Sequence, residues 1–156
     1  MSAAVTLAPA GIADLDAVMD VMAESFDREF GEAWTGPQCA SLLPMPGVWL
    51  TLARESGVPV GFALGRLVAG EAELLLLAVR KGRQRSGVGR KLLDLFVEQA
   101  RQRGAERLHL EVRHGNHAVE LYRKAGFEEV GRRFNYYRGA TGQLYDALTL
   151  ARPANS

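Results

Sequence analysis

The sequence is poor in cysteine, in excess charge and in long apolar runs. Its 156 residues include a single cysteine, Cys39, which excludes an intramolecular disulfide and fits a reducing compartment. A net charge of +1 gives no overall reason to expect a nucleic acid or a membrane as partner. The apolar run Leu74–Val79 is far too short to span a bilayer. The N-terminus lacks a basic stretch followed by an apolar core, so we expect no signal peptide and a cytoplasmic location.

The composition is that of an ordinary globular protein, with 47% hydrophobic and 24% charged residues. Neither repeats, low-complexity segments nor a linker interrupt the chain. A length of 156 residues is enough to bury a sizeable core. We therefore expect residues 1–156 to form one domain.

Apolar spacing and turn residues predict strands and helices in mixed order. Strands are predicted at residues 5–7, 48–54, 60–68, 74–79, 107–112, 127–137 and 143–150. Helices are predicted at residues 12–26, from 37 to before Pro44, from 88 to Gly104, and from about 117 to Gly126. A turn is expected at Pro9–Gly11. This order predicts an α/β or α+β fold with helices on both faces of a mixed sheet.

The stretch Gln84–Gly89 lies between an apolar strand and an amphipathic helix. A glycine-bearing turn that leads directly into a helix directs free backbone N–H groups and the positive end of the helix dipole at one point, which favours phosphate. Leu92 stands where a dinucleotide fingerprint has its third glycine, and no P-loop lysine follows. The alternatives are a simple turn and a solvated basic face.

The form of this stretch, Q/R-x-x-G-x-G, resembles the acyl-CoA pyrophosphate loop of the GCN5-related N-acetyltransferases (GNAT). The order of elements matches that superfamily over most of the chain. Leu110–Arg113 and Leu121–Phe127 resemble the L-E-V-R and L-Y-x-x-x-G-F motifs of its RimI subgroup. Gly131–Tyr137, followed by Asp146-Ala147, resembles the ending of that subgroup. RimI-type enzymes acetylate the N-terminal alanine of a small-subunit ribosomal protein.

The resemblance implies a GNAT fold, with a mostly antiparallel sheet of about seven strands, and acetyl-CoA as co-substrate. It assigns the cofactor pyrophosphate to the backbone N–H groups of Arg85, Ser86, Gly87, Val88, Gly89 and Arg90. The pantetheine arm would pair with Leu77, Ala78 and Val79, where the family has a bulge that frees an N–H for the thioester oxygen. Six basic residues are candidates for pairing with the phosphates: Arg80, Lys81, Arg83, Arg85, Arg90 and Lys91.

Glu111 is the candidate general base. It lies on the strand face opposite the apolar residues, and partial burial would raise the pKa of a glutamate toward a useful value. The alternative is an ordinary strand-edge carboxylate that pairs with Arg113 or Arg107. His109 shares the face and is a second candidate base.

Tyr122 is the candidate acid, because a phenol can protonate a thiolate as its charge develops. The alternative is an aromatic ring that packs between Leu121 and Phe127. Asn116 is expected either to hydrogen-bond the cofactor arm or to cap the following helix. Its spacing to Tyr122 is one residue shorter than the subgroup usually has, so Tyr122 is the better anchored of the two.

The acceptor can be argued from amine basicity. A protein α-amine has a pKa near 7.7–8.0 and a lysine near 10.4, so a neutral lysine at pH 7 costs roughly 3.5 kcal/mol more. A water-linked glutamate therefore suits an N-terminal α-amine. Tyr136, Tyr137, Trp34 and Trp49 are candidates for lining a groove for an extended N-terminal peptide, or for ordinary packing.

Other functions remain open at this point. A related acetyltransferase could act on a small-molecule amine or on lysine, and a non-catalytic acyl-CoA-binding module would need neither Glu111 nor Tyr122. His109, His114 and His117 make a weak metal site without a firm third ligand, and we expect no metal. The basic cluster at residues 80–91 lacks the interleaved aromatic residues typical of nucleic-acid binding, so we expect no DNA partner.

Overall fold

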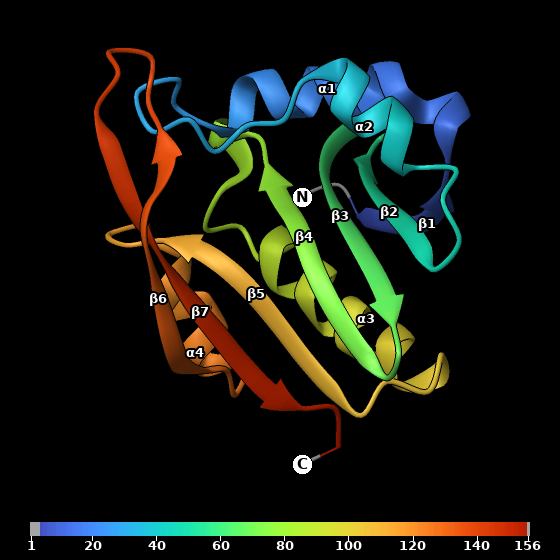
Figure 1. The fold of residues 1–156 in the computed structure, drawn as a ribbon. Coiled ribbons are helices and arrows are strands. Elements are labelled where there is room, and N and C mark those ends of the chain that lie inside the picture. The colour runs from blue at the N-terminus through green and yellow to red at the C-terminus, as the bar shows by residue number, and fades with distance from the viewer. Residues whose placement is uncertain (1–3, 156) are drawn as a thin grey trace.

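The computed structural model describes residues 4–155. They form a seven-stranded sheet in the order β1-β2-β3-β4-β5-β7-β6 (Figure 1). The strands are β1 (Val5–Ala10), β2 (Val48–Glu55), β3 (Val58–Val68), β4 (Glu71–Val79), β5 (Arg107–Arg113), β6 (Glu128–Arg138) and β7 (Leu144–Pro153). Neighbouring strands are antiparallel except β4 and β5, which run parallel. The prediction of a mixed, mostly antiparallel sheet is confirmed.

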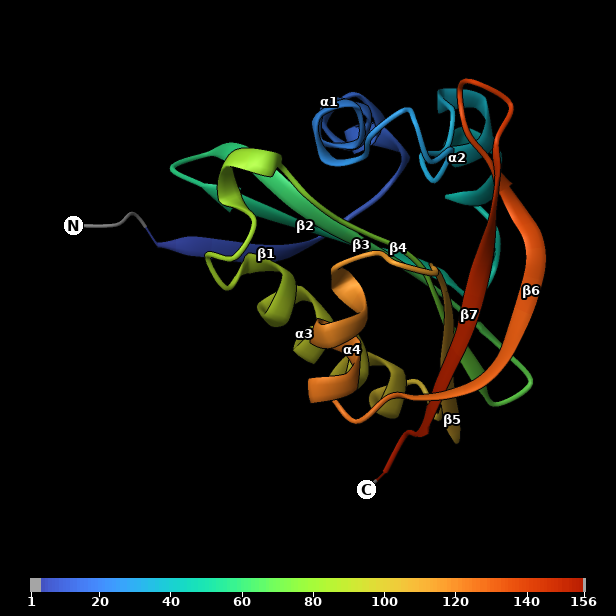
Figure 2. The same ribbon diagram turned by 90° about the vertical axis from the view of Figure 1, so that its left-hand side faces the viewer.

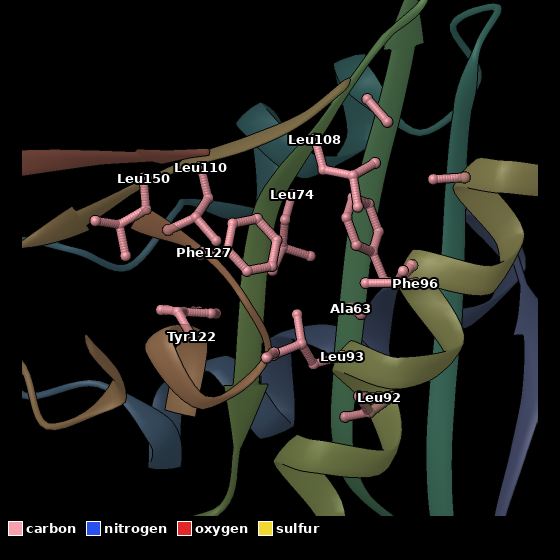
Figure 3. Close-up of a cluster of buried hydrophobic side chains, with 14 of the residues drawn as sticks. Ala63, Leu74, Leu92, Leu93, Phe96, Leu108, Leu110, Tyr122, Phe127 and Leu150 are labelled. Carbon is pink, nitrogen blue, oxygen red and sulfur yellow. The ribbon is translucent and has the colours of Figure 1, made fainter. Parts of the chain in front are cut away.

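Helices cover both faces of the sheet, as predicted (Figure 2). The helices α1 (Leu15–Ser25) and α2 (Gly36–Leu42) pack over one face, and α3 (Val88–Gln102) and α4 (Ala118–Lys124) pack over the other. The buried residues of α3 recur at helical spacing, and Figure 3 shows Leu92, Leu93 and Phe96 directed at the strands. Within residues 4–155, no helix is long and apolar enough to cross a membrane.

A bulge interrupts β4 at Leu75. On the neighbouring strand β3, Leu64 pairs with Leu76 and Gly65 pairs with Leu74, so Leu75 has no partner there. The extra residue reverses the faces of the strand, because Leu74 packs in the cluster beneath α3 while Leu76 packs in the cluster beneath α1. Since helices cover both faces, both side chains are buried.

The same point marks the separation of β4 from β5. Their pairing ends at Leu74 and Leu110, whereas β5 continues to pair with β7 as far as Arg113 and Ala147. Residues 75–79 of β4 therefore have no β5 partner along one edge. This opening between two adjacent strands positions the site described below.

The main corrections to the predicted elements are at the N-terminal end. The strand β1 extends to Ala10 through the residues predicted as a turn, and Pro9 is tolerated because β1 is an edge strand. Residues 12–14, predicted as helix, form a short 3-10 turn, η1 (Ile12–Asp14), before α1 begins. A second such turn, η2 (Lys81–Arg83), follows β4, and β4 itself starts at Glu71.

Candidate active site

The loop that enters α3 presents a row of free backbone donors. Arg85 and Gly87 have φ angles of +66° and +91°, and the first helical bond runs from the N–H of Lys91 to the carbonyl of Gly87. Among residues 4–155, the N–H groups of residues 85–90 have no hydrogen-bond acceptor. Left-handed residues beside a helix start turn successive N–H groups toward one side, which makes a concave site for an anion.

The two glycines of the loop serve different purposes. Position 87 requires glycine, because its positive φ would strain a residue with a Cβ. Gly89 has helical geometry, and a Cβ there would meet only Leu121 and Val79, at 3.5 and 3.7 Å. Protein packing alone therefore does not require glycine at 89, and its missing side chain leaves the main chain accessible from outside.

A groove of about 870 Å³ runs from this loop along the end of β4 to the start of α4. Of the residues predicted to bind the cofactor, eight line it: Leu77, Ala78, Val79, Arg85, Gly87, Gly89, Arg90 and Asn116. The side chains of the other two face elsewhere. Ser86 donates its hydroxyl to the carbonyl of Arg83, and Val88 is buried in the core, so these residues offer only their N–H groups.

Most of the basic residues near the loop are already paired. Arg80 pairs with Glu24, Lys81 with Asp27, Arg83 with Glu55 and Arg90 with Asp94. Within the described chain, Arg85 and Lys91 have no carboxylate partner. Two of the six basic residues predicted as candidates for pairing with the phosphates therefore have no carboxylate partner among the described residues.

A second, smaller cavity of about 120 Å³ occupies the opening between β4 and β5. It is lined by residues 73–77 of β4, by Glu111 and Val112 of β5, and by Tyr122 of α4. Six residues line both this cavity and the groove: Phe26, Glu32, Leu77, Asn116, Ala118 and Tyr122. The two spaces therefore meet at these residues.

Glu111 is held in the smaller cavity by two donors. Its Oε1 accepts a hydrogen bond from Arg133 Nε at 2.9 Å, and its Oε2 accepts one from Thr149 Oγ1 at 2.6 Å. Only 10% of its side chain is exposed, whereas 61% of the Arg133 side chain is. The alternative pairing with Arg107 or Arg113 is wrong, because those arginines pair with Glu71 and Glu32.

The ring of Tyr122 packs in the core, while its hydroxyl remains accessible to solvent. The ring lies edge-on to Phe127, with centroids 6.1 Å apart, inside the cluster drawn in Figure 3. The hydroxyl makes no hydrogen bond to the described residues and is not sealed from solvent. Burial, followed by the negative charge of Glu32, raises the pKa of this phenol. The ring of Tyr122 therefore packs as the alternative expected, and Tyr122 also lines the smaller cavity.

Asn116 caps α4 and also contacts Glu32. Its Oδ1 accepts a hydrogen bond from Ala118 N at 2.8 Å, and its Nδ2 donates to Glu32 Oε2 at 2.7 Å. The capping alternative is therefore present in the structure, although Asn116 still lines the groove. Glu32 was missed by the sequence analysis. Its only signal was an acidic residue inside the glycine-bounded segment 31–36, two positions before Trp34.

The aromatic residues predicted to line a peptide groove divide into two groups. Trp34, Tyr136 and Tyr137 line the smaller cavity. Trp49 does not, because it stacks on Phe96 at 5.5 Å and is buried beneath α3. Burial, with a smaller contribution from Glu32, also raises the pKa of the Tyr137 phenol.

His117 lines the groove, whereas His109 and His114 line neither cavity. His109, the second candidate base, hydrogen-bonds Glu71 at 3.1 Å and lines neither cavity. In residues 4–155, no three His, Cys, Asp or Glu side chains are grouped so that they could hold a metal ion.

The family model, the relatives and the solved structure that match this chain are all acetyltransferases. The model of the acetyltransferase (GNAT) family matches residues 15–127. The [ribosomal protein bS18]-alanine N-acetyltransferase of Escherichia coli K12 is 39% identical over 100 residues, which are 64% of this chain and 67% of that protein. The Haemophilus influenzae protein of the same name is 38% identical over 97 residues, 62% of this chain and 66% of its own. The crystal structure of the ribosomal-protein-S18-alanine N-acetyltransferase from Escherichia coli superposes with a TM-score of 0.86 at 30% identity, covering 98% of this chain and 96% of that one.

Proposed function

This chain belongs to the acetyltransferase (GNAT) family, and on that premise we propose that it acetylates the α-amine of an N-terminal alanine, with acetyl-CoA as donor. The acceptor we propose is a small-subunit ribosomal protein in the cytoplasm, since the relatives named above are bS18-alanine N-acetyltransferases. One observation carries the proposal. A row of free N–H groups is joined by a groove to a cavity that Glu111 and Tyr122 both line.

The groove has the chemistry that acetyl-CoA requires. The N–H groups of residues 85–90 are donors for the pyrophosphate, and the uncommitted Arg85 and Lys91 supply charge for the phosphates. The edge of residues 77–79 has no β5 partner and offers main-chain bonds to the amides of the pantetheine arm, like an added strand, although the carbonyl of Val79 already accepts a hydrogen bond from Gln84 Nε2 at 3.0 Å. A donor on the same edge would stabilise the developing oxyanion by about 3 kcal/mol.

Acetyl-CoA, when bound, supplies a thioester that an amine attacks and a thiolate that departs. Glu111 accepts the proton of the attacking amine through water, since its carboxylate is oriented by Arg133 and Thr149 in the cavity. Tyr122 donates its phenolic proton to the departing sulfur from the place where groove and cavity meet. An α-amine near pKa 8 suits such a weak, water-linked base.

The size of the cavity supports a small first residue. A volume of about 120 Å³ is the share of roughly four water molecules. Trp34, Tyr136 and Tyr137 line this cavity and do not line the groove. Because the donor's acetyl group has to enter the same space, a small alanine side chain is favoured there over a large one.

Product location by mass spectrometry tests the proposal. We expect acetyl-CoA turnover on a peptide that begins with alanine, with the label on the α-amine. We expect kcat/KM to be at least about tenfold lower for the same peptide beginning with leucine, which is about 1.4 kcal/mol in the transition state.

Two controls separate the rival functions. The alanine peptide with a blocked N-terminus and an internal lysine tests ε-amine transfer, and a polyamine tests small-molecule transfer. Faster labelling of either would replace the proposal with that acceptor class. Cofactor binding without turnover on any acceptor would identify a non-catalytic acyl-CoA-binding module.

A further inference from the structure

Glu32 lies on the segment between α1 and α2, far in sequence from the other residues of the site. Its side chain is only 10% exposed, and it lines both the groove and the smaller cavity. The segment that carries it has no regular structure between Ser25 and Gly36. A nearly buried carboxylate on such a segment needs partners, because an unpaired buried charge is costly.

Both carboxylate oxygens of Glu32 have a donor. Oε1 accepts a hydrogen bond from Arg113 Nε at 3.0 Å, and Oε2 accepts one from Asn116 Nδ2 at 2.7 Å. The Arg113 side chain is 11% exposed, and its guanidinium lies 3.6 Å from the ring centroid of Phe30, on the same segment as Glu32. A buried ion pair is weak evidence for stability, so its importance here lies in the geometry that it fixes.

The contact with Asn116 determines how α4 begins. Because the Nδ2 of Asn116 donates to Glu32, the amide is oriented with Oδ1 toward the N–H of Ala118, which it accepts at 2.8 Å. His117, at the N-cap position, contributes no side-chain hydrogen bond, so Asn116 supplies the cap. Tyr122 lies four residues after Ala118, one turn further along the same helix.

Glu32 cannot easily move away from these partners. Gly31, with φ of +70°, lies so close to the main chain of Arg138 that a Cβ would be 1.9 Å from its carbonyl oxygen. Ala140 N donates to the carbonyl of Arg28 at 3.1 Å. The segment is thus fixed against the β6–β7 hairpin on one side while Glu32 reaches the start of α4 on the other.

We infer that Glu32 is a positioning residue for Tyr122, which it acts on through Asn116 and the first turn of α4. It keeps the phenol where the groove meets the smaller cavity. The inference rests on the proposed role of Tyr122 as the acid. The charge of Glu32 has a second, consistent effect, because it adds to burial in raising the pKa of the phenol and so keeps it protonated.

A double-mutant cycle tests this inference. We expect Glu32→Ala to lower kcat about fivefold in the wild-type background but less than about twofold in the Tyr122→Phe background, because coupled residues do not add. Acetyl-CoA affinity, measured by calorimetry, should change less than about twofold. Glu29→Gln, which neutralises an exposed carboxylate on the same segment, is the matched control and should keep wild-type kcat.

Two conservative variants keep the test valid if Glu32→Ala does not fold. Glu32→Gln retains the length and an acceptor oxygen, whereas Glu32→Asp retains the charge but is too short to reach both Arg113 and Asn116. Positioning predicts a higher kcat for Glu32→Gln than for Glu32→Asp, and the reverse order would assign Glu32 an electrostatic role and overturn the inference.

The outcomes also separate this inference from its premise. If Tyr122→Phe alone has wild-type kcat, the proposed acid is wrong and Glu32 has nothing to position. If Tyr122→Phe is slow but Glu32→Ala costs a further fivefold in that background, the acid stands and only the coupling is refuted.

Discussion

The cofactor side and the acceptor side of this molecule are built in different ways. The cofactor side comes largely from one continuous piece of chain, the end of β4 and the loop into α3, and it offers backbone N–H groups. The acceptor side is built from residues of five separate regions, and its side chains include Glu32, Glu111, Tyr122 and Tyr137. Backbone N–H groups are brought to a ligand by the local conformation of one loop, which a short sequence motif can encode. Side chains from separate elements are brought together only when the whole domain folds.

Within the acceptor side, the two carboxylates also differ. Glu111 and Glu32 each accept one bond from an arginine Nε and one from an uncharged donor. The arginine that holds Glu111 lies on the edge strand β6 and is 61% exposed, whereas the one that holds Glu32 is 11% exposed. Both carboxylates are themselves 10% exposed, so the difference lies in their partners, and we propose that Glu111 exchanges protons with water while Glu32 holds a position.

The largest effect is expected from a change to the backbone site. Gly89→Asp places a carboxylate beside the free N–H groups, and we expect it to weaken acetyl-CoA binding roughly a hundredfold, about 2.7 kcal/mol. Calorimetry measures this. Gly82→Asp is the matched control, because it adds the same charge to the same basic region where a Cβ meets nothing within 4 Å. Equal losses from both variants would mean that general repulsion, not the N–H row, governs affinity.

An intermediate effect is expected from the acid. We expect Tyr122→Phe to lower kcat on an alanine peptide about tenfold, less than most general acids because a thiolate leaves readily, with cofactor affinity nearly unchanged. Tyr145→Phe, which removes a phenol outside both cavities, is the control. A wild-type kcat for Tyr122→Phe would leave Tyr122 with a packing role alone.

The pH dependence of kcat also tests the proposed role of Tyr122 as the acid. Because burial and Glu32 raise the pKa of the Tyr122 phenol above its ordinary value of about 10, it stays protonated beyond that pH. The wild-type kcat should therefore not decline between pH 8 and about 10 through loss of this proton.

The smallest effect is expected at the outer wall of the acceptor cavity. Tyr137→Phe removes a hydroxyl from that wall, and we expect KM for the peptide to rise about threefold, less than 1 kcal/mol. The affinity for acetyl-CoA should not change, because Tyr137 does not line the groove. A change in cofactor affinity alone would contradict the division between the two sides.

The same division explains what the sequence could predict. The order of elements follows from local periodicity, and the resemblance to the family's short motifs singled out the loop before α3, Glu111 and Tyr122. Glu32 was not predictable, because its partners lie 81 and 84 positions away in the chain. Arg133 was missed as the partner of Glu111 because that contact depends on the register of β6 with β7 and of β7 with β5.

Two groups of candidate residues are divided by the structure for the same reason. Trp49 was grouped with the groove residues by type, but its position on β2 directs it at Phe96 of α3. The basic residues around the loop were grouped by proximity in sequence, and four of them pair with carboxylates, three of which lie on other elements. Composition identifies the kinds of side chain available, while non-local contacts decide which remain free.

A crystal structure with bound acetyl-CoA tests the central claim most directly. The account predicts pyrophosphate oxygens about 3 Å from the backbone nitrogens of residues 85–90, with the sulfur beside the Tyr122 hydroxyl and the acetyl group directed toward the cavity of Glu111. A pyrophosphate bound elsewhere, or a sulfur remote from both side chains, would contradict it.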